Sequence, residues 1–123
     1  MAKKAESLDF EITLLEGIYR RDESDARIIE LLASLYTEAG RYDEGLSLDQ
    51  RHVKLEPKNP TAHYNLACSL ALKKEYDQAL ASMRTALECG FNDLDWAMKD
   101  PDLKDLRCDR RFHALLQEFQ VRS

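Results

Sequence analysis

Hydrophobic residues recur every three or four positions along most of the chain, the spacing of one face of an α-helix. The stretch 26–39 is typical, with apolar positions at Ile28, Ile29, Leu32, Leu35 and Tyr36. Comparable faces follow in the stretches 8–20, 41–55, 60–74, 76–89 and 109–120, and a short helix is expected after Leu94. The pattern therefore predicts an all-α protein of about six to seven helices.

Punctuating residues separate these stretches. Ser24 or Asp25 can cap the helix that begins at residue 26, and Gly40 can adopt the left-handed conformation that ends it. Asn59 can cap the next hairpin, with Pro60 in the first turn, where its missing N–H costs nothing. These signals predict two helical hairpins in succession.

The chain repeats itself with a period of 34 residues. A shift of 34 places Leu32-Ala33 on Leu66-Ala67, Tyr42 on Tyr76, Gly45 on Ala79 and Leu46 on Leu80. We therefore predict one domain, 1–123, with an N-terminal helix at 6–21, repeat 1 at 26–59, repeat 2 at 60–93, and a degenerate third repeat with a capping helix at 94–120. The small residues predict close approach of the two helices within each hairpin.

These positions resemble the tetratricopeptide repeat family, and the C-terminal segment resembles the cap of small bacterial members. The shared features are Leu32-Ala33, Tyr42, Gly45 and Pro57, then Leu66-Ala67, Tyr76, Ala79 and Ala86. The chain departs from the pattern at Asp49 and His52, which stand where repeat 2 has Met83 and Ala86. The resemblance implies a right-handed α-α superhelix whose first helices line a concave groove that holds a peptide or helix of a partner protein.

That arrangement places a set of first-helix side chains in the groove. They are Arg27, Glu30, Leu31, Ser34, Thr37, Thr61, Tyr64, Asn65 and Cys68, joined by Asp95, Met98 and Lys99 if the register continues. Asn65 can bond a peptide backbone and Tyr64 offers a flat apolar ring. Two alternatives stay open: Asn65 bonds within its own helix stack, and Tyr64 packs against a neighbouring helix.

Some members of the family clamp a C-terminal carboxylate with Lys and Asn on the first helix. Glu30 and Ser34 stand at those positions here. Because Glu30 would repel such an anion, we do not expect this clamp.

Composition narrows the classes of partner. With 18 basic and 23 acidic residues the net charge is −5, which opposes binding to nucleic acid. The three cysteines form no CxxC pair, so we expect reduced thiols, no disulfide framework and a cytoplasmic location. No stretch resembles a signal peptide or a bilayer span, so no membrane is expected as a partner.

Few polar residues are spaced for chemistry. Asp49 and His52 lie one helical turn apart and form either a structural polar pair or a catalytic or pH-sensing one. The arginines Arg107, Arg110 and Arg111 form either a solvated face or a docking patch for an acidic partner. No set of residues has the spacing of a catalytic or metal site, so we predict no enzyme activity, no metal and no cofactor.

The sequence thus predicts a protein–protein interaction module that binds in its concave groove, as a monomer or weak homodimer. Two alternatives remain: a chaperone for secreted proteins, and an assembly domain that binds through its caps or its convex face.

Overall fold

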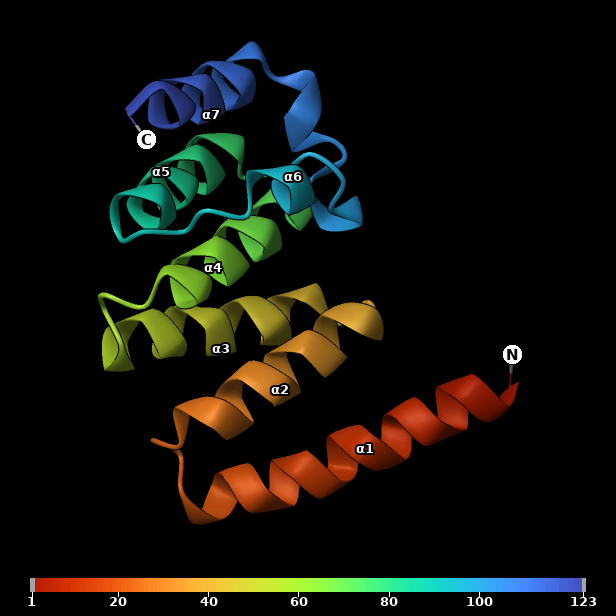
Figure 1. Cartoon of the computed structure of the whole chain (residues 1–123). Coiled ribbons are helices and arrows are strands. Elements are labelled where there is room, and N and C mark those ends of the chain that lie inside the picture. Colours follow the sequence, from red (N-terminus) through yellow and green to blue (C-terminus); the bar gives the residue numbers. More distant parts are fainter. Residues whose placement is uncertain (1, 123) are drawn as a thin grey trace. The chain divides into compact units, whose positions relative to one another are not determined.

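The computed structural model describes residues 2–122, and side chains from residue 5 to residue 121, as a succession of helices (Figure 1). The α-helices are α1 (Ala2–Arg21), α2 (Ala26–Glu38), α3 (Tyr42–Leu55), α4 (Pro60–Leu72), α5 (Tyr76–Glu88), α6 (Leu94–Ala97) and α7 (Arg110–Arg122). Two 3-10 helices, η1 (Pro101–Leu103) and η2 (Leu106–Cys108), connect α6 to α7. The all-α prediction is confirmed, and sequential antiparallel helix pairs form the fold as in a repeat solenoid. Within the described residues, no helix combines the length and the apolar character needed to cross a bilayer.

Two compact units form along the chain, unit 1 (Met1–Pro57) and unit 2 (Lys58–Ser123). The division falls within two residues of the predicted boundary between repeats 1 and 2. Unit 1 contains α1 to α3, and unit 2 contains α4 to α7. The single domain predicted across both stays a prediction.

In unit 1, α2 packs between α1 and α3 (Figure 1). The buried core residues are Ile12, Ile29, Leu32, Ala33, Tyr36 and Leu48. The Tyr36 hydroxyl donates a hydrogen bond of 2.5 Å to Glu16 of α1, and the Arg41 guanidinium lies 4.7 Å above the Tyr36 ring. Helix α1 begins at Ala2 rather than at residue 6.

The predicted helix ends have the expected physical causes. The side chain of Asp25 accepts hydrogen bonds from the amides of Arg27 and Ile28, and Asn59 caps α4 in the same way. Gly40 ends α2 with a φ of +78°. Lys74 stands 34 residues later and adopts the same left-handed conformation, with a φ of +63°. The hairpin turn thus requires this geometry even where the residue is not glycine.

Small residues bring α2 and α3 close together, as the repeat predicts. A Cβ atom added at Gly45 would lie 2.9 Å from the Thr37 Oγ1 atom and 3.3 Å from the Ala33 carbonyl oxygen. In unit 2 the corresponding Ala79 is fully buried.

Replacing Gly45 with leucine should therefore lower the free energy of unfolding by about 1–3 kcal/mol, because the larger side chain overpacks the hairpin. Gly17 on α1 provides the matched control, since an added Cβ there meets nothing within 4 Å. Urea denaturation of both variants measures the difference. Equal effects of Gly45→Leu and Gly17→Leu would contradict the proposed close packing.

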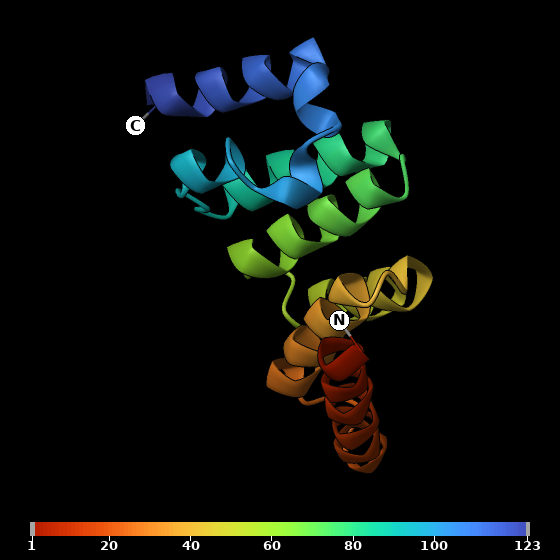
Figure 2. The ribbon, with the colours of Figure 1, turned by 90° about the vertical axis from the view of Figure 1, so that its right-hand side faces the viewer.

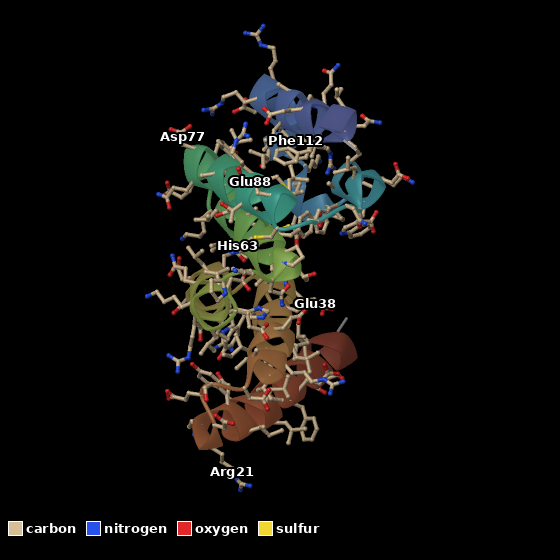
Figure 3. The ribbon with its side chains drawn as sticks, turned by 60° about the vertical axis from the view of Figure 1, so that its left-hand side comes forward. Arg21, Glu38, His63, Asp77, Glu88 and Phe112 are labelled. Carbon is tan, nitrogen blue, oxygen red and sulfur yellow. The ribbon has the colours of Figure 1, made fainter. Side chains whose placement is uncertain are left out.

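In unit 2, the segment after α5 runs along the α4–α5 hairpin, and α7 lies against α5 (Figures 1 and 2). The apolar face of α7 is inward as predicted, since Phe112, Leu115 and Leu116 are buried. Figure 3 places Phe112 on the side of α7 that faces α5.

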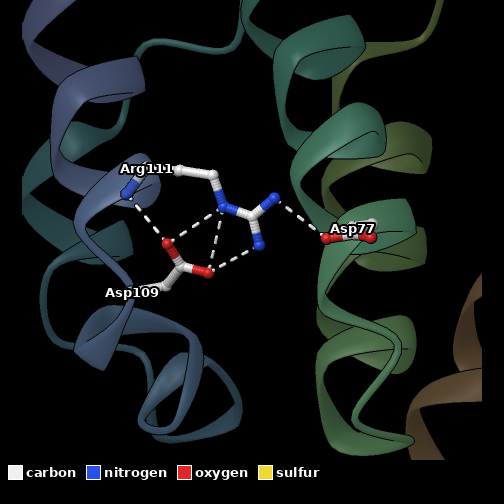
Figure 4. A network of polar contacts seen from close by, with 3 residues as sticks. All are labelled: Asp77, Asp109 and Arg111. Atoms are coloured by element: carbon white, nitrogen blue, oxygen red, sulfur yellow. Dashed lines mark hydrogen bonds and ion pairs between the residues drawn. The ribbon is translucent and has the colours of Figure 1, made fainter.

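Ion pairs join α7, and the residue that precedes it, to α5. Arg111 donates to Asp109 and, at 2.9 Å, to Asp77 (Figure 4). Hydrogen bonds to Asp109, and next to Asp77, raise the pKa of the Arg111 side chain, while those from Arg111 lower the pKa of Asp109. Arg84 pairs with Glu118 at 2.8 Å. All these groups are solvent-accessible, so each pair contributes little to stability and mainly sets the register of α7.

The structure shows the surroundings of Arg107 and of the pair Asp49 and His52. Arg107 does not form a solvated face, because its Nη1 atom donates to the carbonyl oxygens of Ala97 and Asp100 at 3.1 and 2.7 Å. Asp49 and His52 are both buried, and His52 Nε2 lies 2.9 Å from a carboxylate oxygen of Glu56. The pH-sensing role of His52 stays a prediction.

Candidate functional site

The outer side of α2 carries the five groove residues predicted in unit 1. Arg27, Leu31 and Ser34 are exposed, and Leu31 retains 51% of its surface although it is apolar. Glu30 and Thr37 are half-buried. Thr37 is directed partly toward α3, since its Oγ1 atom donates to the Ala33 carbonyl and lies close to Gly45. Helix α2 thus presents a mixed apolar and polar surface.

The corresponding side of α4 is partly covered by the chain itself. Thr61 is exposed and Asn65 half-buried, but Tyr64 and Cys68 are buried. The Tyr64 hydroxyl donates to Asp100 at 2.7 Å, and its ring stacks on Phe91 with centroids 4.2 Å apart. Tyr64 and Cys68 therefore do not line an open groove. The contacts match the alternative in which Tyr64 packs within the fold.

Asp100 holds the covering segment in place. Its Oδ2 atom accepts from Tyr64 and lies 3.7 Å from the Cys68 sulfur, and its Oδ1 atom accepts from the Asp102 amide at 3.0 Å. Pro101 follows as the first residue of η1, where a proline needs no hydrogen bond of its own. We call Tyr64, Cys68, Asp100 and Asp102 the Asp100 network.

Protons in the Asp100 network are held on the donors. Burial, and next the charge of neighbouring groups, raises the pKa values of Tyr64 and Cys68, so both remain protonated at neutral pH and can donate to Asp100. Burial, and next the Asp100 carboxylate, also raises the pKa of Asp102. The network is therefore a set of protonated donors around one buried carboxylate.

The same residues can be compared with the needs of a metal ion. Among the described residues, Cys68, Asp100 and Asp102 form a group whose possible metal ligands, a sulfur and two carboxylate oxygens, lie within 4.8 Å of one another. A cation there would have to displace the hydrogen bond from Tyr64 and the proton of the Cys68 thiol, because metal ligation requires the thiolate. The residues fit a hydrogen-bond network better than a metal site.

The raised pKa of Asp102 predicts a dependence of stability on pH. Folding raises the pKa of the Asp102 carboxyl group above its ordinary value of 3.8. The protonated group does not lower the free energy of unfolding, but the ionised group does. Stability is therefore lost as the pH rises from 3.8 through the pKa of the folded state. Replacing Asp102 with asparagine removes this loss. The difference in unfolding free energy between Asp102→Asn and the unaltered protein should therefore grow in favour of asparagine as the pH rises from about 4 towards neutrality. Denaturant titrations across this range measure it, and a constant difference would contradict the assignment.

A pocket of about 340 Å³ opens between α6 and α7. Its lining residues are Leu94, Asp95, Met98, His113, Leu116, Gln117 and Gln120. Asp95 and Met98 belong to the predicted groove set, and the predicted Lys99 follows them as an exposed residue. The α7 residues were missed, because the apolar face of that helix predicts only a cap. The spacing of His113, Gln117 and Gln120 by four and three residues was the available signal.

The pocket combines an apolar surface with groups that can bond a peptide backbone. Met98 retains 45% of its surface there. His113 Nε2 lies 2.7 Å from the Arg107 carbonyl oxygen, which can only accept, so Nε2 carries a proton and donates this bond. The amides of Gln117 and Gln120 can both donate and accept. This arrangement can hold one apolar side chain and the polar backbone beside it.

Comparison with known proteins gives two distant relationships, and no protein-family model matches the chain. A chloroplastic protein from Arabidopsis thaliana is 26% identical over 113 residues, which cover 89% of this chain and 34% of that protein. Rhomboid protease GluP from Bacillus subtilis is 38% identical over 60 residues, 49% of this chain and 12% of that protein. The chain thus spans about a third or less of these relatives, and its hairpins have the packing of a tetratricopeptide-like helical module.

Proposed function

We propose that unit 2 of the protein binds a segment of a partner protein beside its α4–α5 hairpin, and that the protein acts by binding rather than by catalysis. The observation that supports this most directly is the pocket between α6 and α7. The exposed residues of α2, Leu31 above all, offer a second contact surface of the same mixed character.

The ligand that fits best is an extended segment with one apolar anchor residue. The anchor would contact Met98 and Leu116, while the Gln117 amide bonds a peptide group beside it. A single pocket of this kind supports an affinity of about 1 µM, or about −8 kcal/mol. Most of that affinity would depend on the anchor, as is usual where few contacts dominate an interface.

Peptides selected from a random phage library on the unaltered protein provide the test. Binding of a selected peptide, measured by isothermal titration calorimetry, should weaken about tenfold or more in Met98→Gln and in Gln117→Ala. Leu55→Gln is the matched control, because Leu55 is an exposed apolar residue on α3, which belongs to unit 1 and does not line the pocket. Failure to select any peptide, or equal binding by all three variants, would reject the proposal.

A second candidate, an assembly domain that binds through a cap, is favoured by one observation. Helix α1, at the N-terminal end of unit 1, exposes an apolar stripe that nothing in the groove proposal uses.

A further inference from the structure

Helix α1 is apolar on two faces. One face, with Ile12 at its centre, packs against α2 in the core of unit 1. The other consists of Phe10, Leu14 and Ile18, which we call the outer stripe, with 69%, 54% and 41% of their surfaces exposed. Successive members are four residues apart, so they lie on one side of the helix. Three large apolar side chains in a row on one helix mark an interaction surface rather than scattered exposure.

The repeat shows which occupant does not fit. By the 34-residue shift, Leu14 corresponds to Leu48 of α3, which is buried in the core with the residues of α2. If the first helix of a repeat, here called a first-type helix, docked on the outer stripe, it would therefore copy the α2–α3 contact. That contact depends on Gly45, and on Ala79 in unit 2, but α1 has Glu11 at the same position. Docking a first-type helix there would bury the Glu11 carboxylate, which is costly without a partner.

A second copy of α1 fits better because the outer stripe is self-complementary. If two copies pair antiparallel with Leu14 facing Leu14, Phe10 of one copy meets Ile18 of the other, since each lies four residues from Leu14. Opposite charges then meet at the ends of the contact. Glu6 lies eight residues before Leu14 and Arg21 seven residues after it, both exposed and on the same side of the stripe.

We propose that the outer stripe of α1 is the interface of an antiparallel homodimer, with its two-fold axis at Leu14. Figure 3 shows Arg21 projecting from the end of α1, where Glu6 of a second copy would meet it. One helix pair buries less than the roughly 1,200 Å² of a standard interface, so the dimer is weak. The proposal is independent of peptide binding, because the stripe and the α6–α7 pocket lie in different units.

Analytical ultracentrifugation of the full chain from about 10 µM to about 1 mM provides the first test, over the range expected for a weak complex. The unaltered protein should dimerise within that range. Leu14→Gln, which keeps helix propensity, should raise the dissociation constant at least about tenfold. Val121→Gln, a substitution at an apolar residue with 80% of its surface exposed on α7, should not. A monomer throughout the range, or equal effects of both variants, would overturn the proposal.

Charge reversal tests the register. Glu6→Lys and Arg21→Glu should each weaken the dimer, because each places two like charges at both ends of the contact. The double variant restores opposite charges and should recover most of the affinity of the unaltered protein. A double variant weaker than both single variants would overturn the antiparallel register.

Disulfide trapping tests the position of the two-fold axis, in a Cys108→Ser background that removes the exposed native thiol. Leu14→Cys should form an intermolecular disulfide under mild oxidation, because the two copies of residue 14 face each other. Phe10→Cys should not, because its two copies lie eight residues apart along the axis, about 12 Å. Equal trapping at both positions would indicate a parallel pair and overturn the proposal, and circular dichroism would verify that each variant is folded.

Discussion

Replacing Phe112 with alanine should lower the free energy of unfolding by about 3–5 kcal/mol, the usual cost of emptying a buried aromatic site. Phe112 has no exposed surface and lies on the side of α7 that faces α5 (Figure 3). Its ring also meets the His113 ring edge-on, with centroids 5.6 Å apart. Removing it leaves a cavity in the packing of α7, the helix that covers the end of unit 2. Urea denaturation followed by circular dichroism measures the loss.

Phe10→Ala is the matched control for this prediction. It makes the same chemical change at a residue with 69% of its surface exposed, so in dilute solution its effect should be within about 0.5 kcal/mol. Hydrogen exchange should also show that Phe112→Ala loses amide protection first in α7. A loss below about 1 kcal/mol would mean that α7 is not packed as described.

Replacing Asp100 with alanine should cost about 2–4 kcal/mol, because it leaves buried donors without their acceptor. The Tyr64 hydroxyl, the Cys68 thiol and the Asp102 amide all point to the Asp100 carboxylate. Asp100→Asn keeps one acceptor oxygen and should cost less than the alanine variant. Chemical denaturation at neutral pH measures both.

Asp105→Ala provides the control in the same segment, since Asp105 is exposed and its side chain caps no helix end. Its effect should be within about 0.5 kcal/mol. A double-mutant cycle of Asp100→Ala with Tyr64→Phe should give a coupling energy of at least about 1 kcal/mol, as expected for residues in direct contact. Additive effects would show that the hydrogen bond between them contributes nothing.

The sequence predicts the helices well because their signals are local. Asp25 and Asn59 cap the helices that follow them, and Gly40 ends α2, each through bonds to residues a few positions away. The role of Gly45 is also predictable, because the 34-residue repeat places Ala79 at the same point of the second hairpin. Lys74 shows the limit of such signals, since only comparison with Gly40 reveals that the turn requires a positive φ.

The candidate site was less predictable because it depends on contacts between distant residues. Tyr64 and Asp100 are 36 positions apart, and nothing in the local sequence around either residue predicts the hydrogen bond between them. The groove assignment of Tyr64 and Cys68 rested on their positions along the helix alone, which say nothing of the segment that covers them. At Asp100-Pro101 the chain turns into η1, which covers α4, and Arg107 bonds the backbone of that segment.

The central claim is that the protein binds a peptide in the pocket between α6 and α7. Nuclear magnetic resonance tests it most directly, by following the backbone amide signals during titration with a peptide selected on the protein. The account predicts that the largest shifts occur at residues 94–98 and 113–120. Shifts confined to α3 and α5 would contradict it.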